Sequence, residues 1–142
     1  MDDSDRLRAG DIFLSAMWFL KPQERWPVDD RMFAKVVDKL ATKGNSFATK
    51  FMVLTRVNGR YCPDSREMMA LAKSAGLYSS LTPVYTHILI SVAGRHAHQV
   101  LEAAAHAEAS YAKDVIAFAQ EYWNLAHGLS EPEAVDDATP ET

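Results

Sequence analysis

Apolar positions recur at helical spacing in the first third of the chain. Residues 5–20 place one set of apolar side chains on a single helix face, namely Ile12, Phe13, Ala16, Met17 and Leu20. A second helix is predicted to begin at Asp29 and Asp30, whose negative charge suits the positive end of a helix, and to end before Gly44. Its apolar stripe consists of Phe33, Val36, Val37, Leu40 and Ala41. Both helices are therefore predicted to bury one face.

A third helix is predicted after the crowded segment RVNGRYCPDS, residues 56–65. Asn58-Gly59 is a turn signal, and residues 47–57 before it fit a helical start with an extended exit into that turn. Asp64 is predicted to cap the third helix, with Glu67 reaching back to the cap as in a capping box. The predicted buried face consists of Met68, Leu71, Ala72 and Ala75, and Gly76 ends the helix.

The last third of the chain predicts a strand and then one long helix. Residues 84–90 are rich in β-branched and aromatic residues, as in a strand. In residues 96–126 the apolar positions follow a heptad spacing. This seam favours pairing with the same helix of a second copy, although packing on its own domain remains an alternative. The predicted dimer or partner interface comprises Leu101, Ala104, Tyr111, Val115, Phe118 and Tyr122.

Composition and charge divide the chain into two parts. The length of 142 residues suits one domain, predicted at residues 1–128. Residues 129–142 are predicted to be a disordered acidic tail, because they are rich in Asp and Glu and hold no aromatic residue. Residues 21–73 carry eleven Lys and Arg against six Asp and Glu, which permits a nucleic-acid partner. Within them, Arg31, Lys35 and Lys39 share one helix flank, which we interpret as a solvated face.

The sequence predicts neither a membrane segment nor a secretory signal. The apolar run at residues 12–20 is too short to span a bilayer, and acidic residues precede it. A single cysteine excludes an internal disulfide and fits a reducing cytoplasm, where we expect the protein to act.

Candidate catalytic and metal-binding residues are few. Cys62 stands in no C-x-x-C or protease-like motif, so we interpret it as a small, partly buried spacer. His98, Glu102 and His106 share one helix face and offer ligands for zinc, but the sequence indicates no fourth ligand. We therefore predict no metal site, no cofactor and no enzymatic activity. The tryptophans are expected in the core or an interface.

Two stretches resemble known families. ALAKSAGLYSS followed by YTHILISVAGRHAHQVLE resembles the end of a winged helix, in which a helix leads through L…GL to two wing strands and a Gly-Arg turn. There Gly94 would permit the tight exit from the wing, and Ser91 would cap the next helix. RVNGRYCPDSREMMALAKSAGL resembles the pattern of small Panacea-type antitoxin domains, with Gly59-Arg60 in place of Gly-Pro. The resemblance covers about residues 47–102.

These resemblances imply an α+β, mostly helical, winged-helix-like domain with a long C-terminal helix. The function they imply is a non-enzymatic regulator that binds DNA as a homodimer. Its expected DNA contacts are Arg66, Lys73 and Ser74 on the third helix, Arg56 and Arg60 in the preceding turn, and Arg95 at the base of the wing. The alternative is a protein-interaction module (an antitoxin, adaptor or anti-defence factor) that uses the C-terminal helix and the aromatics Tyr78 and Tyr85.

Overall fold

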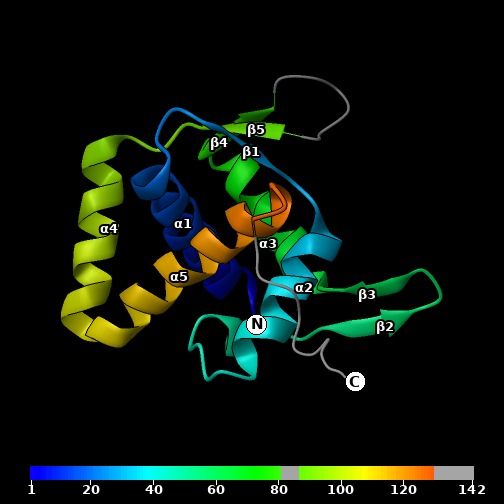
Figure 1. The fold of residues 1–142 in the computed structure, drawn as a ribbon. Helices are drawn as coiled ribbons and strands as arrows, with labels where there is room; N and C mark the ends of the chain where they lie inside the picture. The colour runs from blue at the N-terminus through cyan, green and yellow to red at the C-terminus, as the bar shows by residue number, and fades with distance from the viewer. Residues whose placement is uncertain (81–86, 130–142) are drawn as a thin grey trace.

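The computed structural model describes residues 1–80 and 87–129. The described residues are α+β and 63% helical, which confirms the prediction of an α+β, mostly helical chain (Figure 1). The helices of the described residues are α1 (Asp3–Leu20), α2 (Asp30–Ala41), the 3-10 helix η1 (Ala48–Lys50), α3 (Pro63–Ser74), α4 (Gly94–Ala107) and α5 (Ala109–Ala126). The strands are β1 (Arg25–Pro27), β2 (Leu54–Arg56), β3 (Gly59–Tyr61), β4 (Tyr78–Ser80) and β5 (His87–Ile90).

Helix α1 lies at the centre and packs against α3, α4 and α5 (Figure 1). Its middle is buried on nearly all sides, so its apolar residues meet several helices at once. Phe13 lies edge-on to Phe33 of α2 at 5.5 Å and to Phe118 of α5 at 5.8 Å between ring centroids. Edge-to-face aromatic packing of this kind adds to the stabilisation from burial.

Strands β1, β5 and β4 form a three-stranded antiparallel sheet in that order. Trp26 of β1 pairs with Ile88 of β5, and both side chains are buried. The Trp26 ring lies edge-on to Trp123 of α5, with 4.9 Å between centroids, so the tryptophans join the sheet to the helices. The predicted strand at residues 84–90 is confirmed for β5, while residues 84–86 lie outside the described part.

A second antiparallel pair, β2 and β3, forms a hairpin that projects from the helical body beside α2 (Figure 1). Its turn is Val57-Asn58, and Gly59 has a φ of +116°, a conformation that only glycine adopts without strain. Val57 at the tip is fully exposed. The predicted turn and the extended approach to it are confirmed, but the turn lies one residue earlier than predicted, because Gly59 already pairs with Arg56 as the first residue of β3. The predicted helical start is the short η1.

The prediction of one long C-terminal helix is wrong. The chain breaks at Glu108, which has an extended backbone with φ −161° and ψ 103°, and this residue separates α4 from α5. Helix α4 packs along α1, whereas α5 crosses α1 and also packs against α2 (Figure 1). A straight helix could not contact both surfaces, so packing overrides the continuous heptad pattern. Val115, Phe118 and Tyr122 are buried in the chain's own core.

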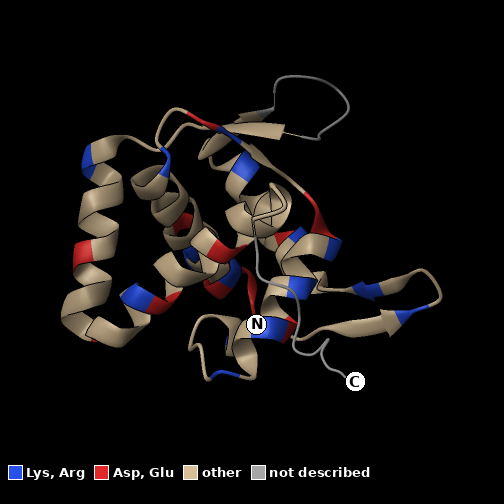
Figure 2. Cartoon of the chain, in the orientation of Figure 1, with Lys and Arg blue, Asp and Glu red and all other residues tan. Residues whose placement is uncertain are grey.

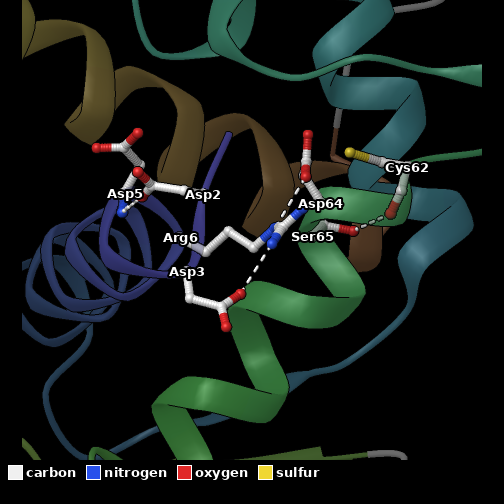
Figure 3. A network of polar contacts seen from close by, with 7 residues as sticks. All are labelled: Asp2, Asp3, Asp5, Arg6, Cys62, Asp64 and Ser65. Carbon is white, nitrogen blue, oxygen red and sulfur yellow. Dashed lines mark hydrogen bonds and ion pairs between the residues drawn. The ribbon is translucent and has the colours of Figure 1, made fainter.

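The predicted cap at Asp64 is also wrong. Cys62 is the N-cap of α3 and Pro63 is its first residue, a position that suits proline because no amide hydrogen is needed there. Asp64 instead accepts a hydrogen bond from Nε of Arg6 in α1 at 3.0 Å, and the hydroxyl of Ser65 donates to the carbonyl of Cys62 at 2.9 Å (Figure 3). The start of α3 is thus fastened to α1.

Helix α4 begins differently from the prediction at Ser91. Its N-cap is Ala93, with no side-chain hydrogen bond, and the amide of Ser91 donates to the carbonyl of Leu77. Gly94 has an ordinary helical conformation, but a Cβ there would lie 2.8 Å from the ring of Trp18. A side chain at residue 94 would therefore have to displace the Trp18 ring, so the glycine serves close packing against α1 and not a tight turn.

Among residues 1–80 and 87–129, none of the helices combines the length and the apolar character that crossing a bilayer requires.

Candidate functional site

Positive charge is concentrated on one part of the structure. Residues 30–74, which form α2, η1, the β2–β3 hairpin and α3, hold nine Lys and Arg but only four Asp and Glu. The remaining described residues hold six Lys and Arg against ten Asp and Glu. Figure 2 shows that the hairpin carries only basic charge, whereas both signs occur on α1 and α5. The chain therefore has one cationic side.

The two arginines of the hairpin have different environments. Arg60 on β3 donates from Nε and Nη2 to the carboxylate of Asp38 on α2, at 2.6 and 2.8 Å, and from Nη1 to Thr55. This partner raises the pKa of Arg60 and fixes the hairpin to α2. Arg56 donates to the hydroxyl of Tyr61 from Nε at 2.9 Å and from Nη2 at 2.6 Å. Arg56 makes no ion pair within the described residues, so its charge faces solvent.

Helix α3 presents Arg66, Lys73 and Ser74 on exposed positions, as the sequence predicts for contact residues. The Arg66 side chain is 75% exposed, and its Nε lies 3.8 Å from Oδ2 of Asp30 at the start of α2. That distance gives only a weak ion pair across solvent. Arg66 is therefore available to an external anion.

A cavity of about 500 Å³ lies between α3 and the start of α2. Its lining includes the aromatic core residues Phe13, Phe33, Tyr78 and Tyr122 and the charged residues Asp29, Asp30, Arg66 and Lys73. The hydroxyl of Tyr122 donates to the carbonyl of Pro27 at 2.8 Å and accepts from the amide of Asp29 at 3.1 Å. Burial raises the pKa of Tyr122, so this phenol stays neutral at physiological pH.

The structure does not bring all six predicted DNA contacts together. Arg56, Arg60, Arg66, Lys73 and Ser74 belong to the hairpin and α3. Arg95 lies in the first turn of α4, on the side of the molecule away from the hairpin (Figure 1). Tyr78 of the alternative partner surface is buried and donates to the carbonyl of Met69, while Tyr85 lies outside the described residues.

Two basic residues of this side were not predicted as contacts. Arg31 and Lys35 of α2 are exposed and make no ion pair within the described part of the chain. Lys39, on the same flank, donates to Glu121 of α5 at 3.0 Å. The helical spacing of these residues was the only sequence signal for a contact surface, and the same spacing is typical of a solvated helix flank.

The candidate zinc ligands and Cys62 lie in separate packing environments in the structure. No cluster of three His, Cys, Asp or Glu side chains that could hold a metal ion occurs among the described residues. His98 instead lies edge-on to the rings of Trp18 at 5.8 Å and Phe19 at 6.3 Å. Cys62 is fully buried, and that burial raises the pKa of its thiol.

The basic α2–hairpin–α3 side and the adjoining cavity are therefore the two candidate sites. Comparisons of the chain with models of protein families, with curated proteins and with solved structures each found no match. What the chain does must accordingly be argued from these two sites.

Proposed function

We propose that the protein is a non-enzymatic, winged-helix-like regulator that binds double-stranded DNA through α2, the hairpin and α3. The observation that carries this proposal is the excess of nine Lys and Arg over four Asp and Glu in residues 30–74. DNA presents a dense row of phosphates, and a basic surface gains affinity by releasing their counterions. The projecting hairpin places part of this charge beyond the helical body (Figure 1).

The order of elements supports the winged-helix comparison. Helix α3 ends at Ser74 and is followed by two antiparallel strands, β4 and β5, with residues 81–86 between them. The connection between α2 and α3 departs from the pattern. It consists of residues 42–62, whereas the two helices of a helix-turn-helix are joined by a turn of only three or four residues. The β2–β3 hairpin occupies this connection. A two-stranded ribbon fits the major groove of DNA, so the hairpin is a second reading element beside α3.

The residues of the interface have separate roles. Arg56, Arg66 and Lys73 are proposed to contact phosphates, together with the exposed Arg31 and Lys35. Arg60 orients the hairpin through Asp38 and reaches phosphate only when that pair opens. Ser74 is an exposed hydroxyl that can donate to the DNA backbone, whereas Arg95 lies outside this interface.

The test is a comparison of two quadruple variants by fluorescence anisotropy with a labelled random-sequence duplex. R56A/R60A/R66A/K73A removes four charges from the interface, and R8A/R25A/R95A/K113A removes four exposed charges elsewhere. We expect the first variant to lose most of its affinity, with a shallower dependence on salt of about 0.9 logarithmic units per lost phosphate contact. The second variant should retain at least part of the parent's affinity and of its salt dependence. Equal affinity of the first variant and the parent, or no binding by the parent at low salt, would refute DNA binding.

A second candidate function is protein interaction at the groove between α4 and α5. The break at Glu108 leaves a groove of about 350 Å³ there, lined by Leu101, Ile116 and the half-exposed Phe19. The proposed occupant is a second copy of the chain, because a twofold contact at this groove would cover the half-exposed Phe19 of each copy. Light scattering should then show a dimer for the parent and a monomer for F19S/I116K. A monomeric parent at high concentration would exclude this candidate.

A further inference from the structure

We propose that the acidic segment at residues 130–142 docks on an exposed basic flank of α2 and competes there with DNA. The docking is a contact within one chain and does not depend on DNA binding, whereas the competition rests on the proposed function. The segment contains no Lys or Arg, and its five acidic residues are Glu131, Glu133, Asp136, Asp137 and Glu141. It therefore complements a surface of positive charge.

The flank of α2 carries cations that no described carboxylate neutralises. Arg31 and Lys35 stand one helical turn apart, so they are neighbours on the helix surface, and both are exposed. Neither forms an ion pair with another residue of the part of the chain that the structure describes. Asp38 follows Lys35 by three residues on the same flank, but its carboxylate already accepts two hydrogen bonds from Arg60. Arg31 and Lys35 are thus open to an acidic partner.

Arg66 of α3 adds a third cation next to the start of α2. Its side chain is 75% exposed, and Nε lies 3.8 Å from Oδ2 of Asp30, the first residue of α2. An exposed pair at that distance is weak, so Asp30 leaves the guanidinium able to meet another carboxylate. The basic flank consists of Arg31, Lys35 and Arg66.

Helix α5 leads the chain to this flank. The hydroxyl of Tyr122 accepts from the amide of Asp29, just before α2, and Trp123 packs against Trp26 of β1 (Figure 1). The end of α5 therefore lies beside the residues that lead into α2. A chain as long as residues 130–142 can extend over about 40 Å, while α2 is about 18 Å long. All of the basic flank is within reach.

The covalent connection makes a weak contact sufficient. A short flexible connection gives an effective concentration in the millimolar range, so ion pairs too weak to join separate molecules can form within one chain. Exposed ion pairs are screened by salt, and DNA phosphates require the same three cations. The docked segment therefore lowers the affinity of the chain for DNA, and a duplex that binds tightly displaces it.

Carbodiimide crosslinking of the dilute full chain without DNA tests the docking. The reagent joins a lysine amine to a carboxylate in contact with it, and mass spectrometry identifies the joined peptides. We expect residues 130–142 to be joined to Lys35. Lys21 is the internal standard, because its Nζ lies 5.4 Å from the centre of the Trp123 ring and any segment that follows α5 meets it.

A charge variant separates docking from random encounter. R31A/R66A keeps every lysine, and it should lower the yield at Lys35 relative to Lys21 about fivefold, the combined effect of two exposed ion pairs. R8A/R95A, which removes two exposed arginines elsewhere, should leave that ratio unchanged. Chains labelled with nitrogen-15 and mixed with unlabelled chains should give no mixed crosslinks. An unchanged ratio in R31A/R66A, no crosslink at Lys35, or crosslinks mainly between chains would overturn the docking.

Anisotropy with the random-sequence duplex tests the competition. The full chain with E131Q/E133Q/D136N/D137N/E141Q should bind DNA at least about twofold more tightly, the gain expected when half of the chains are docked. The same five changes in an R31A/K35A/R66A background should have no effect, because the docking surface is already absent. An equal gain in both backgrounds would show long-range repulsion and overturn the competition. A parent that binds no DNA would refute the proposed function alone, since the crosslinking decides the docking without DNA.

Discussion

Arg60 of the hairpin and Asp38 of α2 form a two-point contact, with Nε–Oδ2 at 2.6 Å and Nη2–Oδ1 at 2.8 Å. A two-stranded hairpin is marginally stable by itself in water, so this contact gives the hairpin a fixed direction. The side chains are 49% and 39% exposed, which limits what the pair adds to the stability of the fold. The main effect of the contact is therefore on the orientation of the basic hairpin relative to α2.

Replacing Asp38 by Asn tests the charge of the proposed interface at that contact. The substitution removes one negative charge and keeps the side-chain shape. We expect DNA affinity at low salt to rise about twofold, the effect of one unit charge roughly 8 Å from a phosphate in water. Glu102→Gln, which removes an exposed acid from α4, is the matched control and should have no effect. A fall in affinity for Asp38→Asn would mean that hairpin orientation, and not charge, dominates binding.

Gly94→Ala should destabilise the protein through the contact with Trp18. The new Cβ would lie 2.8 Å from Cη2 and Cζ2 of the indole, which must move. Since the ring can shift as a whole, we expect a loss of about 1 kcal/mol in the free energy of unfolding, near the low end for overpacking. Urea denaturation measures it. The double variant with Trp18→Phe should recover part of the loss, because the two residues are in contact, and additive losses would contradict the steric explanation.

Stability should fall at alkaline pH through Tyr111. Burial raises the pKa of Tyr111 to about 12, and the carboxylate of Glu108 acts in the same direction. In the unfolded chain the phenol ionises near pH 10, so above that pH the unfolded state binds fewer protons than the folded state. The contribution of Tyr111 to the free energy of unfolding is therefore fully present below pH 10 and is lost as the pH rises toward 12.

Urea titrations at a series of pH values between 8 and 12 follow this loss. Tyr111→Phe should remove about 1–2 kcal/mol of the decrease, as expected for one partly buried phenol. Identical pH profiles of the variant and the parent would show that Tyr111 does not carry the effect.

Cys62 should resist alkylation in the folded protein. The thiol is fully buried and its pKa is raised, so reagent access and thiolate formation are both disfavoured. We expect iodoacetamide to react at least about a hundredfold more slowly than in urea, because labelling requires opening of the fold. Mass spectrometry gives both rates. A native rate close to the unfolded one would restore Cys62 as a candidate nucleophile.

The elements that the sequence predicts correctly are those with local signals. Asp29 before an apolar stripe predicts α2, and its carboxylate does accept from the amides of Arg31 and Met32. Asn58-Gly59 predicts the hairpin turn for a similarly local reason, since Gly59 adopts a positive φ. Each of these features depends on a few neighbouring residues, so the local sequence is sufficient to predict it.

The features that the sequence does not predict depend on distant residues. Nothing near Glu108 resembles a helix stop, because neither glycine nor proline occurs there and the apolar spacing continues. Asp64 has a suitable position for capping α3, yet Arg6 of α1 binds its carboxylate. For the candidate site, residue type identifies the arginines, but the partner of Arg60 emerges only when the hairpin lies beside α2.

The break at Glu108 also determines how α4 is held. Ala97 and Leu101 are the only residues of α4 that are buried. Helix α4 also contacts α1 through His96, whose Nε2 lies 2.8 and 3.0 Å from the carboxylate oxygens of Asp11, and through His98, whose ring lies edge-on to Trp18 and Phe19. Opening α4 therefore uncovers fewer buried side chains of its own than opening α5, which has six. Amide hydrogens of α4 should exchange with solvent well before those of α1 and α5, in an event separate from global unfolding.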